Sequence, residues 1–174
     1  MGIPLSTYAR NFLNDEAQAR RFLGRPVLVW ESPNEAFQDE LFTTEAGETR
    51  KLPRAGSPVV FEVRKSSSKT NAFAMGITIG RTGNNDVVLE DNSVSRFHAY
   101  FQQDAKDSHW KLVDAESKNG SWINGIRMTA GKAEAVADQA QLRFGDVEVH
   151  SFYLDPFSSF CKSNSSVSAY FSKR

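Results

Sequence analysis

The sequence predicts an all-β protein, an antiparallel sandwich or barrel, with a short helical segment in front of it. Short runs of strand-forming residues recur from residue 58 onward. Turn signals rich in Gly, Asn and Asp separate these runs, as at 83–86, 119–120 and 124–125. Nothing resembles the regular alternation of strands and helices that builds a parallel sheet.

The composition is that of an ordinary globular protein. The chain has 174 residues, which suggests one domain with extensions, and 40% of them are hydrophobic. Basic and acidic residues number 21 each, so the basic excess of a general nucleic-acid binder is missing. The single Cys161 favours a reducing, cytoplasmic location. The balanced charge therefore predicts no nucleic-acid partner. Because residues 1–13 lack a signal-peptide pattern and no apolar run reaches about 20 residues, we also expect no membrane association.

The first 30 residues predict two helices and one strand. Ser6 or Thr7 is a candidate cap for the first helix, and the second is expected over 15–23. Gly24 and the following Pro26 end the helical pattern. Residues 27–30 then read as a buried strand.

The chain divides into three segments by composition. Residues 1–57 form an extension that ends in a long loop, residues 58–154 hold the strand-rich core, and residues 155–174 form a serine-rich tail. Residues 50–69 are locally basic, which is typical of a solvated surface or of a patch that steers an acidic partner. The sequence leaves open whether the extension is part of the sandwich.

Within the core, the apolar alternation places each strand. Runs at 59–63, 77–79, 87–89, 97–101, 110–112, 142–144 and 147–151 are strand-like. In one of them, Phe97, Ala99 and Phe101 are expected on one face, and His98 and Tyr100 on the other. The Gly145–Asp146 pair predicts a turn between the last two strands.

Three of the predicted turns carry hydrogen-bond donors suited to an oxyanion. Arg81 follows the strand at 77–79, and its guanidinium can hold a phosphate with two parallel hydrogen bonds. Ser95 offers a short hydroxyl, and Asn119 offers an amide that can pair with an extended peptide. Taken singly, each is better explained as an ordinary surface residue or turn. Together, donors without matching acids favour an anion that comes from another molecule.

The neighbours of these residues complete the candidate site. Lys118 adds a positive charge, Gly80 leaves room for close backbone approach, and Gly120 suits a tight turn. A general-base role for His98 would need a nucleophile and an orienting acid, so we interpret it as structural support for the turn that presents Ser95.

The sequence offers few candidate catalytic residues. The three histidines and Cys161 lack metal-ligand spacing, and no Walker loop or dinucleotide fingerprint occurs. We therefore expect no enzymatic activity, no metal and no cofactor.

From about Val59 to Leu154, the chain resembles the forkhead-associated (FHA) domain family. The matching text is Ile79-Gly80-Arg81, Asn84-Asn85-Asp86-Val87-Val88-Leu89, Val94-Ser95-Arg96-Phe97-His98-Ala99, Leu112-Val113-Asp114, Ser117-Lys118-Asn119-Gly120-Ser121-Trp122-Ile123-Asn124-Gly125 and Phe144-Gly145-Asp146-Val147. The resemblance implies a sandwich of about eleven strands that binds phosphothreonine peptides.

The resemblance also assigns roles. Arg81 and Ser95 match the main phosphate contacts, with Arg96 in the same binding set, and Asn119 matches the residue that holds the peptide backbone. Lys118 stands where Ser or Thr is common, and Ser121 stands where Thr is commoner. The histidine of the motif is structural in that family.

The function implied is that of an adaptor in Ser/Thr kinase signalling. Its partner would be a phosphothreonine-containing protein, such as a Ser/Thr kinase or a kinase substrate. The alternative is a phosphate-independent assembly module, in which the N-terminal segment supplies an apolar contact surface or simply caps the sandwich. A third hypothesis is that Thr7, Thr43, Thr44, Thr49 or Thr70 is phosphorylated and bound in cis or between copies. A small stand-alone module with these extensions is typical of bacteria.

Overall fold

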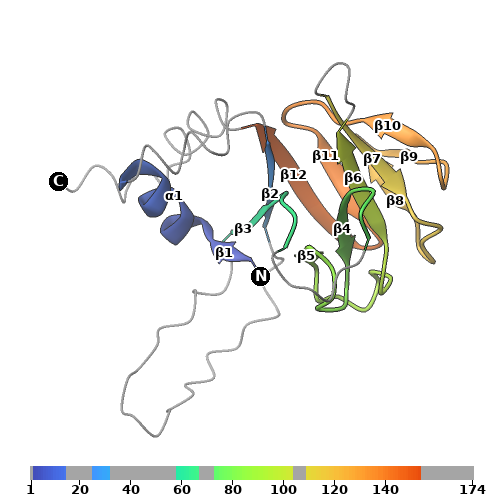
Figure 1. The fold of residues 1–174 in the computed structure, drawn as a ribbon, viewed down its shortest axis with the longest axis horizontal. Coiled ribbons are helices and arrows are strands. Elements are labelled where there is room, and N and C mark those ends of the chain that lie inside the picture. Colours follow the sequence, from blue (N-terminus) through green and yellow to red (C-terminus); the bar gives the residue numbers. More distant parts are fainter. Residues whose placement is uncertain (1, 15–24, 32–57, 67–72, 104–108, 154–174) are drawn as a thin grey trace, which may run out of the picture.

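The computed structural model describes residues 2–14, 25–31, 58–66, 73–103 and 109–153 (Figure 1). The predicted second helix at 15–23, most of the loop before residue 58 and the serine-rich tail lie outside the described residues. Of the threonines proposed for binding in cis, only Thr7 is described.

The described chain forms twelve strands and one helix. The elements are β1 (Ile3–Pro4), α1 (Leu5–Asn14), β2 (Pro26–Trp30), β3 (Val59–Glu62), β4 (Ile77–Gly80), β5 (Val87–Val88), β6 (Ala99–Gln103), β7 (Trp110–Asp114), β8 (Ser121–Ile123), β9 (Ile126–Arg127), β10 (Ala133–Ala135), β11 (Gln141–Phe144) and β12 (Val147–Tyr153). One sheet has the order β1-β3-β2-β12-β11-β8-β9, and the other has the order β10-β7-β6-β4-β5. All pairings are antiparallel except β4–β5, which is parallel.

A single core cluster joins the two sheets. Its largest side chains come from both of them and include Leu28, Phe61, Phe101, Leu112 and Phe144. Inward and outward residues alternate along the strands, so each sheet buries one face against the other. The prediction of an all-β sandwich with a helical N-terminal segment is therefore confirmed.

The N-terminal segment is built into the seven-stranded sheet. β2 pairs with β3 on one side and with β12 on the other, so it is a central strand. Leu28 faces the main core, whereas Val27 and Val29 face outward and pack with Leu5, Tyr8, Ala9, Val60 and Phe152 in a second cluster. Figure 1 shows α1 beside β1 and β3, away from β8 and β9. This part of the segment thus caps the sandwich, while the domain boundaries at 57 and 154 stay predictions.

The predicted cap of the first helix is wrong. α1 begins at Leu5, so Ser6 and Thr7 lie inside its first turn. The Leu5 N–H donates to the carbonyl oxygen of Pro58 at 2.8 Å. A tertiary contact therefore satisfies one of the N–H groups that a side-chain cap would otherwise bind.

The predicted faces of the run at 97–101 are only partly right. β6 begins at Ala99, and its buried Ala99 and Phe101 do share the core face. Phe97 lies before the strand and is 39% exposed, and His98 is 0% exposed. The chain bends before Ala99, so the two-residue alternation does not extend to these positions.

Candidate functional site

The predicted site residues gather on three connections at one rim of the sandwich. Arg81 follows β4, Ser95 lies in the segment between β5 and β6, and Asn119 lies between β7 and β8. Backbone hydrogen bonds join these connections: Arg81 N–H donates to Ser95 O at 3.0 Å, and Ala115 N–H donates to His98 O at 2.9 Å. The structure thus brings the three predicted donors onto adjoining loops.

Arg81 presents an exposed guanidinium with little to hold it. Its side chain has one long hydrogen bond, from Nη1 to Asn92 Oδ1 at 3.4 Å. The preceding Gly80 is required by a close approach, because a Cβ there would lie 2.3 Å from Arg96 O and 2.7 Å from Asn85 Nδ2. Gly80 therefore allows two loops to meet directly beside the guanidinium.

The hydroxyl of Ser95 is oriented by its neighbours. Lys118 N–H donates to Ser95 Oγ at 3.0 Å, so this oxygen already accepts one hydrogen bond. A hydroxyl has a single proton to donate, and no other group in the described chain accepts it. That proton remains available for an acceptor that arrives at the rim.

His98 ties the Ser95 turn to the Gly120 turn. Its Nδ1 accepts from Ser95 N–H at 2.9 Å, so Nε2 carries the proton and donates to Gly120 O at 3.0 Å. Burial lowers the pKa of His98, although the bond to Gly120 O and the charge of Asp114 act in the opposite direction. The ring is therefore neutral near pH 7 and holds two loops of the rim at a set spacing.

Asn119 is exposed, but part of its amide is already used. Its Nδ2 donates to Ser93 O at 2.7 Å, which leaves the second amide hydrogen and the carbonyl oxygen for another partner. Ser93 in turn connects to the β11–β12 turn, because Asp146 N–H donates to Ser93 Oγ at 2.9 Å. The hydroxyl and the N–H of Ser93 both bind Asp91, and these bonds lower the pKa of that carboxyl.

Asp114, at the end of β7, anchors the turn that carries Asn119. Its carboxylate accepts from Ser117 N–H and from the hydroxyls of Ser117 and Ser121 at 3.0, 2.7 and 2.5 Å. Ser117 Oγ then accepts from Gly120 N–H at 3.0 Å. Burial works against ionisation, but these hydrogen bonds outweigh it and hold the pKa of Asp114 below its usual value.

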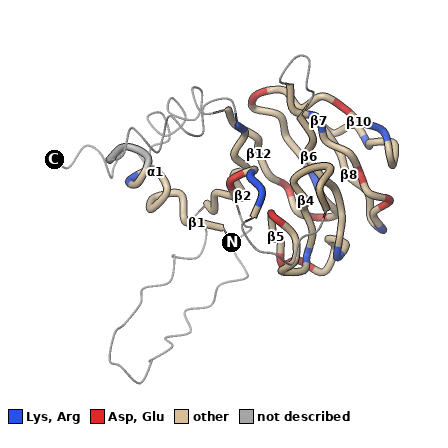
Figure 2. The backbone as a smooth tube through the Cα atoms, in the orientation of Figure 1, with Lys and Arg blue, Asp and Glu red and all other residues tan. Residues whose placement is uncertain are grey.

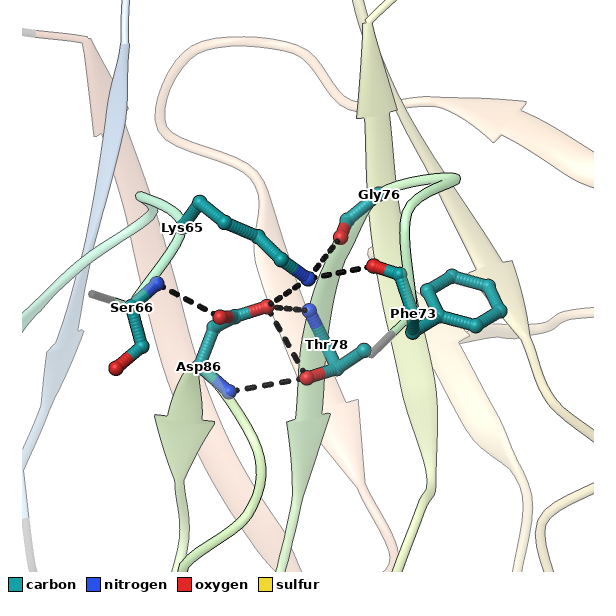
Figure 3. Close-up of polar contacts among 6 residues, drawn as sticks. All are labelled: Lys65, Ser66, Phe73, Gly76, Thr78 and Asp86. Carbon is teal, nitrogen blue, oxygen red and sulfur yellow. Dashed lines mark hydrogen bonds and ion pairs between the residues drawn. The ribbon is translucent and has the colours of Figure 1, made fainter. Parts of the chain in front are cut away.

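Asp86 holds the far end of the loop that follows Arg81, beside Thr78 on β4 (Figure 3). Its carboxylate accepts from Lys65 Nζ at 3.0 Å, from Ser66 N–H at 2.7 Å and from Thr78 N–H at 2.8 Å. Lys65 also donates to the carbonyl oxygens of Phe73 and Gly76. These bonds join the chain after β3 to the loop that follows Arg81.

Sequence reasoning did not assign a role to Asp86 or Asp114. Both are acidic residues next to a strand end, where an exposed carboxylate is the ordinary expectation. The available signal was the clustering of Ser and Thr around them, because a carboxylate that is buried needs several donors.

The rim carries three cations that no described acid pairs with. Arg81, Arg96 and Lys118 are exposed and make no ion pair within the described residues. By contrast, Arg64 and Lys65, from the locally basic segment, pair with Glu62 and Asp86 at 2.7 and 3.0 Å. Figure 2 shows basic and acidic residues spread over both sheets, so an anion would be attracted locally rather than by the whole molecule.

Across the described ranges, no three His, Cys, Asp or Glu side chains gather as metal ligands would. No helix of the described chain combines the length and apolar character needed to cross a bilayer. A polar cavity elsewhere in the described chain contains none of the predicted site residues. Its lining consists of Ile3, Phe61, Glu62, Arg64, Lys65, Ser66, Asp86 and Val87.

Several solved FHA domains are similar to this structure. One, from work on phosphothreonine-dependent FHA domain interactions, is 20% identical with a TM-score of 0.45, over 74% of this chain and 95% of that one. The FHA domain of a hypothetical protein of Arabidopsis thaliana is 18% identical with a TM-score of 0.49, over 74% and 85%. The FHA domain of the CT664 protein from Chlamydia trachomatis is 19% identical with a TM-score of 0.48, over 74% and 96%.

The family comparison identifies the domain directly. No curated protein matches the chain. The FHA domain family, however, matches residues 77–145, which run from β4 through the rim loops to the β11–β12 turn. The rim described above, from Arg81 to Gly120, lies wholly inside the matched range. Residues 77–145 of this chain are therefore an FHA domain.

Proposed function

We propose that this protein is an adaptor that binds phosphothreonine peptides in Ser/Thr kinase signalling. The observation that carries the proposal is the state of Ser95 and Arg81. The Ser95 oxygen accepts from Lys118 N–H, so its own proton is available to a ligand, and the neighbouring Arg81 guanidinium is exposed and has no ion pair with a described residue. A phosphate oxygen is the acceptor that both donors suit.

In this proposal each rim residue has a distinct role. Arg81 and Ser95 donate to the phosphate, Arg96 and Lys118 add positive charge, and Asn119 pairs with the peptide backbone. Gly80, His98 and Gly120 hold the loops in place through the contacts given above. The ligand's phosphothreonine belongs to another protein, such as a Ser/Thr kinase or its substrate, in the cytoplasm.

The energetics agree with a switchable interaction. A phosphate carries about −1.5 to −2 charges at pH 7. Each charge-assisted hydrogen bond contributes about 1.5 to 3 kcal/mol, and micromolar affinity corresponds to about −8 kcal/mol. Two or three such bonds plus backbone pairing are sufficient, and an unphosphorylated threonine loses them.

The test is a fluorescence-anisotropy titration with a phosphothreonine peptide library and the unphosphorylated twin of each peptide. We expect micromolar binding of selected phosphopeptides only. Arg81→Ala should weaken binding about a hundredfold or more, because it removes two charge-assisted bonds. Arg10→Ala is the matched control, since Arg10 is an exposed arginine on α1, beside β1 and β3.

Two results would contradict the proposal. One is equal binding of phosphorylated and unphosphorylated twins, which would favour the assembly alternative. The other is an Arg81→Ala variant that folds and keeps its affinity.

A further inference from the structure

A second group of cations lies on the outer face of the seven-stranded sheet. Trp122 on β8 is opposite Arg127 on β9 and opposite Arg143 on β11, so the three form one cross-strand row. The Arg143 guanidinium carbon lies 3.4 Å from the centre of the indole ring, and that of Arg127 lies 5.6 Å from it. Stacking of this kind holds a guanidinium in place without neutralising it.

Neither arginine of this row has an acidic partner within the part of the chain described here. Glu148 is opposite Arg143 on β12, but its carboxylate accepts from Gln141 Nε2 at 3.3 Å instead. Arg127 is exposed at the sheet edge formed by β9. Its guanidinium is thus a preoriented donor without an acceptor among the described residues.

The row begins at the rim itself. A Cβ on Gly120 would lie 2.9 Å from Arg127 Nε and 3.1 Å from Arg127 Nη2, so the guanidinium rests directly on this glycine. Gly120 follows Asn119, the residue assigned to the peptide backbone. Any side chain at position 120 would push the guanidinium away, which gives this glycine a second role besides its left-handed turn (φ +89°).

The distance from the phosphate donors is short enough for one peptide to reach both places. Lys118 N lies 3.0 Å from Ser95 Oγ. Two residues of chain, from Lys118 to Gly120, span at most about 7 Å, and an extended ligand advances about 3.3 to 3.6 Å per residue. The Arg127 guanidinium is therefore within about four ligand residues of the phosphothreonine.

We infer that Arg127, stacked with Trp122 and Arg143, forms a subsite for an acidic side chain of the bound peptide, within about four residues of the phosphothreonine. This inference rests on the proposed phosphopeptide function and adds a sequence preference to it. The occupant is Asp or Glu because the Arg127 guanidinium, which has no acidic partner among the described residues, complements a carboxylate. Arg127 is a specificity-determining residue here, and Arg143 positions the indole against which it lies.

The experiment uses the full chain and one phosphothreonine peptide in which Asp replaces Ala at each of the four positions on either side. Affinities are measured by isothermal titration calorimetry at low salt. We expect one of these positions to improve affinity about threefold to fivefold, the range of an exposed ion pair. In Arg127→Gln the affinity ratio of the Asp to the Ala peptide should fall to about one, whereas Arg10→Gln should keep it.

A charge swap makes the test sharper. Arg127→Glu should reverse the preference, so that Lys at the same peptide position binds better than Asp. If phosphopeptides bind but no Asp position gains affinity, or if Arg127→Gln keeps the gain, the subsite is overturned while the proposed function stands. If no phosphopeptide binds at all, both the acidic subsite and the proposed function are refuted.

Discussion

Replacing His98 with phenylalanine removes the two hydrogen bonds by which one buried ring joins two loops of the rim. Ser95 N–H loses its acceptor at 2.9 Å, and Gly120 O loses a donor at 3.0 Å. Phenylalanine has a similar ring size, so the change tests hydrogen bonding more than cavity formation. His98 is fully buried and its ring meets Phe144 edge-on, a contact that phenylalanine can keep.

The expected loss of unfolding free energy depends on the hydrogen bonds that Gly120 O and Ser95 N–H keep in the variant. Gly120 O still accepts from Gly145 N–H at 3.0 Å, so it loses one bond of about 0.5 to 1.5 kcal/mol. Ser95 N–H has no other acceptor in the described chain, and an orphaned donor costs about 1 to 3 kcal/mol. We expect His98→Phe to lower the free energy of unfolding by about 2 to 4 kcal/mol.

The same residue predicts a dependence on pH. Burial lowers the pKa of His98, so the unfolded chain binds more protons than the folded one below about pH 6.5. The stabilisation is present above the unfolded pKa and is lost as the pH falls through the folded pKa. The slope for one such group is at most about 1.4 kcal/mol per pH unit. His98→Phe should remove this contribution.

The assay is urea unfolding followed by tryptophan fluorescence at several values between about pH 5.5 and about pH 8. Phosphopeptide titration at the upper pH shows whether the rim has loosened. His150→Phe is the control, because His150 is an exposed histidine on β12. A His98→Phe protein that loses less than about 0.5 kcal/mol and keeps the wild-type pH slope would refute the reasoning.

Two further changes test other parts of the rim. Asp114→Asn replaces one oxygen that accepts hydrogen bonds with an NH₂ donor. It should therefore lower the free energy of unfolding by about 2 to 4 kcal/mol and weaken phosphopeptide binding. Urea unfolding and peptide titration measure the two effects, and unchanged values in both would argue against the anchoring role of Asp114. Gly145→Ala should destabilise by about 1 to 3 kcal/mol, because its φ is +62° and its Cβ would lie 2.5 Å from Ser93 O. Gly131→Ala shares the positive φ (+75°) but meets nothing within 4 Å, so thermal unfolding should show a smaller loss for it, and equal losses would show that the clash is unimportant.

Local patterns were sufficient to predict most of the strands. The strand at Pro26–Trp30 was predicted from its apolar run, and it is buried on both faces because α1 covers the side that the core does not. The alternation of Val147, Val149 and Ser151 also matches their burial in β12. Apolar periodicity predicts such elements well because it indicates which face of a strand is buried.

Alternation misled at Phe97 and His98. A period of two carries meaning only while the backbone stays extended, and the chain bends at these residues before β6 begins. The hydrogen bonds of His98 to Ser95 and Gly120 depend on that bend, and no local pattern encodes it.

The sequence by itself determined the strand-rich architecture, and it predicted Arg81, Ser95 and Asn119 as donors for an anion, because turn chemistry and motif spacing are local properties. The tertiary structure decided how these donors are oriented. Asp86 and His98 satisfy their hydrogen bonds with residues from other loops, and Asp114 binds Ser117 and Ser121 in the turn that follows it. It also placed Arg127 against Gly120, seven positions earlier in the chain, across a β-hairpin. Contacts of this kind arise only when separate strands pair and pack, and for that reason the spacing of residues along the chain could not reveal them.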